Sequence, residues 1–275
     1  MSQQHEDIKQ NVTTLFNKVS GGYDHEAMRY FPFTADAIIH LLRPEPGSKV
    51  LDIATGTGAA AVAAAQVIGP TGRVQAIDLS DNMLDKAVGN VEKMALSNVD
   101  FHIMDAERLD FKSHYFDYAI CSFAIFFLPD IPTAIKSWMR VLKPGGQLVF
   151  TIFADSAFMP MVKIFKQQLE TYGIDFGSAN WGILTTKEQC HALLEQAGAT
   201  EIEIHEKQMG FHLNKASIWW DIICNSAMRG FVDQLSENRL AQFKQEHLKA
   251  VGELATDKGI WLDVLVYFAT GKKQA

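Results

Sequence analysis

Short apolar runs alternate with segments of helical periodicity between residues 49 and 153. The apolar runs predict strands at 50–54, 73–79, 99–104, 116–122 and 147–153. The segments between them predict helices at 59–67, 82–96 and 131–142, the last one ended by Pro144-Gly145-Gly146. Apolar strands that alternate with helices are typical of a parallel sheet with helices on both faces. We therefore expect a ligand site beyond the carboxyl ends of the strands.

The segments on either side of this alternation are mainly helical. Residues 1–42 are amphipathic and interrupted at Gly21-Gly22, and Pro44 and Pro46 then disfavour helix. Towards the other end we expect helices at 158–172, 186–197, 215–228 and 237–254, and strands at 201–205 and 260–270. The pattern predicts one α/β domain with a doubly wound, mostly parallel sheet of seven strands. It would comprise an N-terminal helical arm (1–45), a core (46–153), and cap helices with the final strand pair (154–275).

Composition narrows the class of protein. The 275 residues are 48% hydrophobic, as in a globular protein, and no apolar run is long enough to span a membrane. The first ten residues are polar, without the apolar core of a signal peptide, which favours a cytoplasmic location. A net charge of −7 disfavours a nucleic-acid partner. Cys121, Cys190 and Cys224 lie far apart, so we expect reduced thiols and no metal site.

A glycine-rich turn connects the first predicted strand to the first core helix. Gly56 and Gly58 let the backbone turn sharply and approach a ligand, and the helix presents free N–H groups at its start. The spacing Gly56-x-Gly58-x-x-Ala61 also fits the dinucleotide-binding pattern. At this point a nicotinamide-dependent oxidoreductase competes with an S-adenosyl-L-methionine enzyme.

Three carboxylates at the predicted strand ends favour S-adenosyl-L-methionine. Asp52, directly before the turn, would repel a pyrophosphate but attract the ammonium of S-adenosyl-L-methionine. Asp78 follows Gly58 by about 20 residues, where an acid takes the ribose hydroxyls of either cofactor. Asp105 follows the third strand and can accept a hydrogen bond from the adenine amine.

Several motifs occur in the order that class I methyltransferases show. They are Leu51-Asp52-x-Ala54-x-Gly56-Thr57-Gly58, Asp78-Leu79-Ser80 with Met83-Leu84, Asp105-Ala106-Glu107, and Leu142-Lys143-Pro144-Gly145-Gly146. Together they resemble the motif set of S-adenosyl-L-methionine-dependent class I methyltransferases. The arm segment Phe16-Asn17-Lys18-Val19-Ser20-x-x-Tyr23-Asp24 resembles the ubiquinone/menaquinone C-methyltransferase family.

The resemblance implies a Rossmann-like methyltransferase fold and a role for each matching residue. Asp52, Ala54, Gly56 and Gly58 would line the methionine end of the cofactor, and Asp78 would hold the ribose. Leu79 and Met83 would contact the adenine, whose edge Asp105 and Ala106 would read. Tyr23 would close over the cofactor from the arm, which we expect to act as a lid, and Ser122 would lie near the sulfonium.

The acceptor half departs from the quinone-methylating pattern. Members of that family tend to have Gly-Leu-Arg-Asn after the fourth strand, where this chain has Ala124-Ile125-Phe126-Phe127 after Ser122-Phe123. They also tend to have a Glu near the end of the fifth strand, where Ile152 stands here. The polar residues that would handle a quinol headgroup are therefore missing from these positions.

Aromatic and sulfur-containing residues of the predicted cap favour an apolar or ring-shaped methyl acceptor. They are Phe158, Met159, Met161, Trp181, Trp219 and Trp220, and at most one of the adjacent tryptophans should reach a pocket. Methyl transfer mainly requires positioning of the acceptor; where a base is needed, His25 and Asp155 are candidates. We expect a methyltransferase that acts on a small molecule. A non-catalytic S-adenosyl-L-methionine-binding regulator and a nicotinamide-dependent oxidoreductase are the alternatives.

Overall fold

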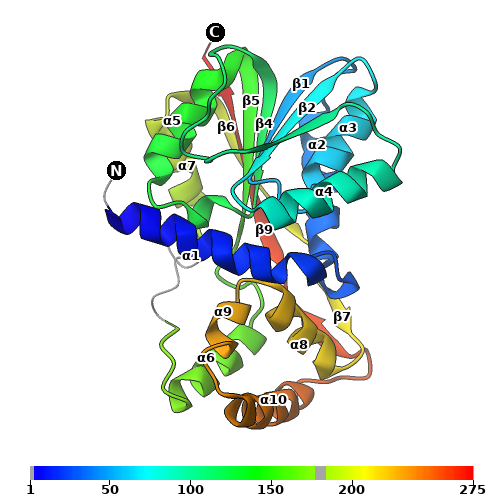
Figure 1. Cartoon of the computed structure of the whole chain (residues 1–275), viewed down its shortest axis with the longest axis vertical. Coiled ribbons are helices and arrows are strands. Elements are labelled where there is room, and N and C mark those ends of the chain that lie inside the picture. Colours follow the sequence, from blue (N-terminus) through cyan, green and yellow to red (C-terminus); the bar gives the residue numbers. More distant parts are fainter. Residues whose placement is uncertain (1–2, 177–183, 275) are drawn as a thin grey trace.

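A seven-stranded sheet forms one half of the molecule (Figure 1). A computed structural model describes residues 3–176 and 184–274. The sheet consists of β1 (Lys49–Ile53), β2 (Arg73–Asp78), β3 (Val99–Ile103), β4 (Phe116–Ser122), β5 (Leu142–Phe153), β6 (Ala199–Gln208) and β9 (Leu265–Lys273). Their order is β3-β2-β1-β4-β5-β9-β6, with β1 to β5 parallel and β9 antiparallel to both its neighbours. This confirms the predicted doubly wound, mostly parallel sheet.

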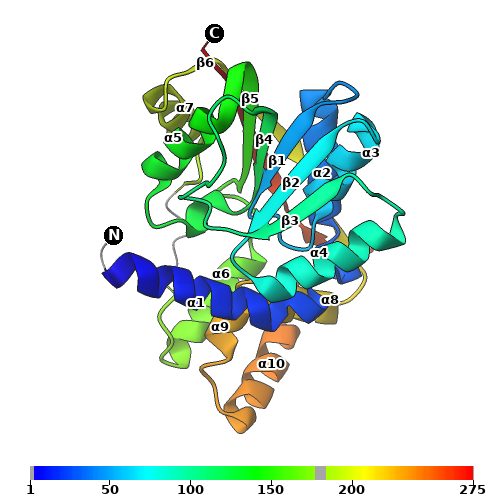
Figure 2. The ribbon, with the colours of Figure 1, turned by 45° about the horizontal axis from the view of Figure 1, so that its top comes forward.

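Helices cover both faces of the sheet, as Figures 1 and 2 show. On one side lie α2 (Tyr30–Leu42), α3 (Ala59–Ile68) and α4 (Asp81–Lys93), and on the other α5 (Ile131–Val141) and α7 (Lys187–Gln196). Alanine, the strongest helix former, dominates α3, and its small side chains allow close packing on the strands. Side-chain caps begin two helices, since Ser80 accepts from the amide of Met83 and Asp130 from that of Thr133.

The predicted N-terminal arm has two parts with different surroundings. Its first helix, α1 (Gln3–Val19), lies across the carboxyl ends of the strands, between the sheet and the cap (Figures 1 and 2). Two short 3-10 turns, Ser20–Gly22 and Glu26–Met28, lead from α1 into α2. The α2 side chains Tyr30, Ala35 and Ile38 are buried in the main core. The lid prediction therefore applies to α1, since α2 belongs to the helical layer of the sheet.

The cap lies on the far side of α1 from the sheet (Figure 1). It contains α6 (Met161–Thr171), α8 (Ala216–Asn225), α9 (Arg229–Val232), α10 (Glu237–Gly252), β7 (Phe211–Leu213) and β8 (Ile260–Leu262). A fully buried histidine, His247, is at its centre: its Nε2 accepts from Trp219 Nε1 at 2.8 Å, and its Nδ1 lies 2.9 Å from Gln168 Oε1. Burial lowers the pKa of His247 to about 4, so the ring is neutral at pH 7.

The predicted strand at 260–270 is wrong, because the chain leaves one sheet for another within it. Residues Ile260–Leu262 pair with β7, whereas β9 starts only at Leu265. The Gln208 side chain holds this corner through its Oε1, which accepts from the amides of Gly210 and Val264. A Cβ at Gly210 would lie 2.2 Å from the carbonyl oxygen of Leu262, so the close approach requires glycine.

The start of the fifth strand also differs from the prediction. The fifth strand begins at Leu142, opposite Phe116, rather than at residue 147, with an irregularity in the pairing between Phe116 and Tyr118.

All three cysteines are free thiols; two are buried, and Cys224 is half-buried. Within the described ranges, no helix has the length and apolar character of a membrane span.

Candidate functional site

A cavity of about 770 Å³ lies beyond the carboxyl ends of β1, β2, β3 and β4, with α1 as one wall. We call it the strand-end cavity. Of the residues predicted to contact the cofactor, all except Asp52 and Gly58 line it. The predicted cofactor residues that line the cavity are Tyr23, Ala54, Gly56, Asp78, Leu79, Met83, Asp105, Ala106 and Ser122. Their cofactor contacts stay predictions, but the topology brings these residues together as the parallel strands required.

Asp52 and Gly58 shape the glycine-rich turn from behind the cavity wall. Asp52 is 1% exposed, and its Oδ2 accepts from Thr55 Oγ1 at 2.5 Å. Burial, opposed in part by hydrogen bonds and reinforced by the charge of Asp78, raises the pKa of Asp52 to about 7. Gly58 has a φ of +88°, and a Cβ there would lie 3.1 Å from the Cβ of Ala87 on α4. Asp52 can therefore act on a cavity ligand through its charge, whereas Gly58 allows close packing of the turn on α4.

Asp78 ends β2 with both carboxylate oxygens held by backbone amides. Its Oδ2 accepts from the amide of Gly56 at 2.8 Å, and its Oδ1 from the amide of Ser80 at 2.9 Å. Burial raises the pKa of this carboxyl, and the amide hydrogen bonds work against that effect. Each oxygen keeps a further lone pair, so the carboxylate can accept from two hydroxyl groups of a ligand.

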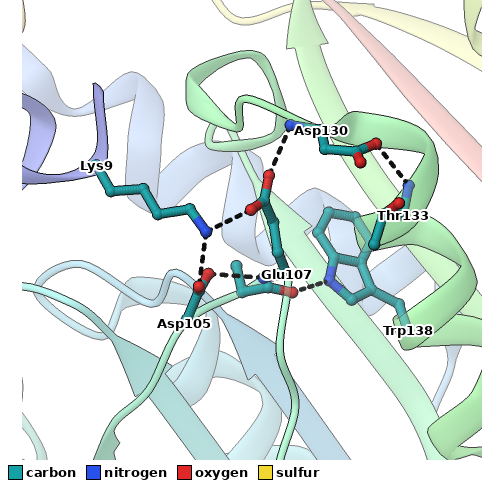
Figure 3. A network of polar contacts seen from close by, with 7 residues as sticks. Lys9, Asp105, Glu107, Asp130, Thr133 and Trp138 are labelled. Atoms are coloured by element: carbon teal, nitrogen blue, oxygen red, sulfur yellow. Dashed lines mark hydrogen bonds and ion pairs between the residues drawn. The ribbon is translucent and has the colours of Figure 1, made fainter. Parts of the chain in front are cut away.

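A polar cluster closes the other end of the strand-end cavity (Figure 3). Lys9 of α1 contacts two carboxylates: its Nζ lies 2.7 Å from Asp105 Oδ2 and also pairs with Glu107. Glu107 Oε1 accepts from the amide of Asp130 at 2.6 Å, and Asp105 Oδ1 from that of Glu107 at 2.9 Å. Burial lowers the pKa of Lys9, but the bonds and charges of the two carboxylates outweigh it, so the net shift is upward.

The sequence analysis missed Lys9 because its partners lie about a hundred residues further along the chain. No local pattern separates it from the other polar residues of α1. The available clue was helical spacing, since Lys9 shares a face with Val12, Thr13 and Phe16, which also line the cavity.

A second cavity, of about 460 Å³, adjoins the first, and we call it the aromatic cavity. Its lining is Phe16, Tyr23, Tyr30, Phe31, Phe123, Phe126, Phe127, Phe153, Phe158, Ser226, Ala227 and Met228, none of which is charged. The two cavities share Phe16, Tyr23, Phe123 and Phe127. Two ring pairs stack in the wall: Phe123 with Phe153 at a centroid distance of 4.2 Å, and Tyr23 with Phe31 at 5.0 Å.

Of the cap residues expected to form an acceptor pocket, only Phe158 lines this cavity. Met161, Trp219 and Trp220 are buried in the hydrophobic core, and Met159 is 39% exposed. Trp181 lies outside the described residues. Most of the aromatic lining instead comes from the N-terminal segment, the loop after β4 and the end of β5.

The two candidate bases lie away from both cavities. His25 is exposed, and its Nδ1 accepts from the amide of Ala27 at 3.2 Å, which caps a 3-10 turn. Asp155 is exposed just beyond β5 and is absent from both linings. Tyr23 reaches both cavities, and burial together with the charge of Asp78 raises its pKa, so its phenol is neutral at pH 7.

Comparisons with known proteins agree with this geometry. Residues 3–178 match the ubiE/COQ5 methyltransferase family. Aklanonic acid methyltransferase DauC of Streptomyces sp. (strain C5) is 32% identical over 143 residues, which are 52% of this chain and 65% of the relative. Demethylmenaquinone methyltransferase of Staphylococcus aureus is 32% identical over 168 residues, 60% of this chain and 67% of the relative. The chain thus spans about two thirds of the length of these curated relatives.

A solved structure shows a related fold. It is phosphoethanolamine N-methyltransferase 2 of Haemonchus contortus in complex with S-adenosyl-L-methionine, with a TM-score of 0.56 and 22% identity. The similarity covers 88% of this chain and 53% of that one.

Proposed function

The chain belongs to the ubiE/COQ5 methyltransferase family, and from this premise we propose that it transfers a methyl group from S-adenosyl-L-methionine to a small, apolar or aromatic molecule. The observation that carries the proposal is the junction of two unlike cavities. One has carboxylates at two strand ends, and the other is walled by aromatic rings. A transferase needs such a pair, because cofactor and acceptor must meet while the rest of each molecule is bound separately.

The strand-end cavity fits the cofactor by chemistry. Asp78 offers two oriented oxygens for ribose hydroxyls, and Asp105 can accept from an adenine amine. Leu79 and Met83 provide apolar contacts for the base between them. Asp52, behind the turn, favours an ammonium group through its charge.

The same residues disfavour a nicotinamide dinucleotide. Dinucleotide folds place a pyrophosphate on the free amides of the glycine-rich turn. Here the amide of Gly56 donates to Asp78, and a second carboxylate, Asp52, is buried directly behind that turn. Family membership likewise supports a transferase over an oxidoreductase.

Bound S-adenosyl-L-methionine supplies an electrophilic methyl group, and the task of the chain is to position the acceptor. Phe123 lies at the junction of the two cavities, where its amide lies 3.1 Å from Thr151 Oγ1 and 3.2 Å from the Thr151 carbonyl oxygen. This fixes the loop after β4 next to Ser122. The surrounding rings exclude water from the place where acceptor and cofactor would meet. A non-catalytic regulator would have no need of this second cavity.

The aromatic lining points to a neutral, ring-shaped acceptor. Burying a charged group among these rings without an opposite charge would be costly. Of the relatives named above, the one designated by demethylmenaquinone fits this class, whereas the one designated by aklanonic acid acts on a compound with an acid group; neither names the acceptor of this chain. Because Phe126 and Phe127 replace polar residues after β4, we propose an acceptor less polar than a quinol headgroup at that position. A cytoplasmic location and an acceptor other than nucleic acid stay predictions from composition.

Transfer of label from S-adenosyl-L-methionine to a panel of small acceptors tests the proposal. We expect neutral ring compounds to be methylated and anionic or strongly cationic compounds of similar size to be ignored. Phe153→Ser should raise the acceptor KM about tenfold or more, the effect of losing a buried aromatic contact, with cofactor affinity unchanged. Phe33→Ser, at a position that is 50% exposed, is the matched control. Labelling confined to charged acceptors would contradict the proposed class.

A further inference from the structure

One face of α1 forms a wall of the strand-end cavity. Lys9, Val12, Thr13 and Phe16 recur at the spacing that places side chains on a single face of a helix, and all four line the cavity. At its C-terminal end α1 is fastened by Lys18, which pairs with Asp233 of the cap at 2.5 Å. In its N-terminal half, ion pairs of Lys9 attach α1 to the loop after β3.

The charges around Lys9 depend on each other. The Lys9 and Glu107 side chains are 9% and 4% exposed, and that of Asp105 is 19% exposed, so the three groups interact with little screening by water. Both carboxylates contact the same ammonium nitrogen. If the ammonium were removed, the two carboxylates would lose the group that holds them together, and their mutual repulsion would turn one of them away.

Asp105 is the carboxylate of this cluster that lines the strand-end cavity. Its Oδ2 is bonded to Lys9 and its Oδ1 to the amide of Glu107, which fixes the plane of the carboxylate. Each oxygen retains a lone pair, and the residue lines the cavity. Trp138 Nε1 donates to the carbonyl oxygen of the next residue, Ala106, at 2.7 Å and so holds the backbone of the loop (Figure 3).

We propose that Lys9 is a positioning residue for the adenine end of the cofactor: its ammonium holds the carboxylate of Asp105 oriented towards the exocyclic amine while it fastens α1 over the cavity. The inference rests on the proposed function, because it takes the ligand of the strand-end cavity to be S-adenosyl-L-methionine. By this proposal the ammonium of Lys9 on α1 contributes to recognition of the adenine base. A purine with a carbonyl oxygen in place of the amine would bind more weakly, because that oxygen and the Asp105 carboxylate are both hydrogen-bond acceptors.

The test compares S-adenosyl-L-homocysteine with S-inosyl-L-homocysteine, which carries oxygen in place of the amine. Calorimetry on the full chain gives the ratio of the two dissociation constants for the wild type and each variant. Lys9→Met should lower this ratio about fivefold or more, because a carboxylate that is no longer held in place loses its selective contact with a donor. Lys9→Arg, which keeps the charge, should stay within about twofold of the wild-type ratio.

Lys18→Met is the matched control, since it removes an ammonium from the same helix and breaks an ion pair outside the cavity. Its ratio should equal that of the wild type. Lys9→Gln serves as the uncharged variant if Lys9→Met does not fold. A merely structural role for Lys9 would weaken both ligands equally, and an unchanged ratio in either uncharged variant would overturn the inference. Wild-type protein that binds neither ligand would instead refute the proposed function on which the inference depends.

Discussion

At the scale of single residues, the two aspartates around the glycine-rich turn have different tasks. Asp78 faces the strand-end cavity, and its oxygens are already bonded to the amides of Gly56 and Ser80. Asp52 lies behind the turn and is bonded to Thr55. A substitution of Asp78 by alanine would therefore disturb the turn as well as any ligand contact. Asparagine is the sharper probe because it keeps one acceptor oxygen for the backbone.

We expect Asp78→Asn to raise the dissociation constant for S-adenosyl-L-homocysteine at least about tenfold. Hydrogen bonds to a charged group contribute about 1.5–3 kcal/mol each, and the variant loses the charge and one acceptor. Calorimetry measures the change, and Asp81→Asn, at an exposed position in the first turn of α4, is the control. A dissociation constant for Asp78→Asn within about threefold of wild type would exclude the ribose role.

We expect Asp52 to make cofactor affinity depend on pH. Its pKa of about 7 means that the carboxyl holds a proton below that pH, and a nearby ligand ammonium favours the ionised form. Binding should therefore release a proton, and affinity for S-adenosyl-L-homocysteine should increase as the pH rises towards 7, then level off. Titrations between about pH 5.5 and 8 measure this, and Asp52→Asn should flatten the profile.

The matched ligand is 5′-methylthioadenosine, which lacks the ammonium and should bind with little dependence on pH in this range. An equal pH dependence for both ligands would assign the titration to another group.

Lys9 marks the limit of prediction at the residue scale. Asp78, Asp105 and the turn glycines could be predicted because each follows a strand, and parallel strands end at a common edge. The partners of Lys9 come from a loop far along the chain, and nothing in the local sequence of α1 specifies them. The positions of His25 and Asp155 were equally hard to foresee, since nearness to Tyr23 or to a strand end does not fix the direction of a side chain.

At the scale of elements, the cap helices are held together around a neutral histidine. The folded-state pKa of His247, about 4, is below the value of about 6.5 in an unfolded chain. The unfolded state therefore takes up a proton first as the pH falls. The stability contributed by the neutral ring is complete above pH 6.5 and is lost between pH 6.5 and 4.

The full loss should amount to about 3.5 kcal/mol of unfolding free energy, because the shift spans about 2.5 pH units at about 1.4 kcal/mol each, and about 2.5 kcal/mol of it should be lost by pH 4.5. Urea unfolding at pH 7 and at pH 4.5 measures it. His247→Gln, which can still accept from Trp219, should lose much less on acidification, whereas the exposed-site control His191→Gln should behave as the wild type does. Equal acid sensitivity in wild type and His247→Gln would contradict this role.

Helix α1 should respond to the cofactor more than its neighbour α2 does. It lies across the strand-end cavity and contributes Lys9, Val12, Thr13 and Phe16 to the wall. The α2 helix instead belongs to the helical layer that packs on the sheet, and one of its faces is buried there. We expect S-adenosyl-L-homocysteine to slow amide exchange in α1 strongly and in α2 little, as for a lid of low local stability. Exchange followed by mass spectrometry decides this, and the same change in both helices would show that α1 is a fixed part of the core.

Element types were predictable where periodicity is clear, and boundaries failed where tertiary contacts decide. The helices of the core follow their predicted ranges closely because their periodicity is a local signal, and in the structure Ser80 and Asp130 cap two of them. The split between β8 and β9 depends on the Gln208 side chain, which binds the corner from another strand. The early start of β5 depends on its pairing with Phe116, which is equally remote in sequence.

At the scale of the whole molecule, the alternation of strands and helices predicts the sheet and the edge where a ligand would bind. It does not predict the aromatic cavity. Its rings come from α1, the turns before α2, the start of α2, the loop after β4, and the end of β5 with the segment that follows it. None of these segments carries a pattern that marks it as part of a cavity. Trp219 and Trp220, which suggested an acceptor pocket, lie instead in the hydrophobic core. The apolar character of the acceptor was thus predicted from residues that mostly do not line the cavity.

Titration calorimetry with S-adenosyl-L-homocysteine and, separately, NADH tests the central claim most directly. The junction of a carboxylate-lined cavity with an aromatic one predicts that one molecule of S-adenosyl-L-homocysteine binds per chain. It also predicts no heat of binding for NADH, because Asp52 and Asp78 surround the turn where a pyrophosphate would lie. Binding of NADH without binding of S-adenosyl-L-homocysteine would contradict the claim that this chain uses S-adenosyl-L-methionine.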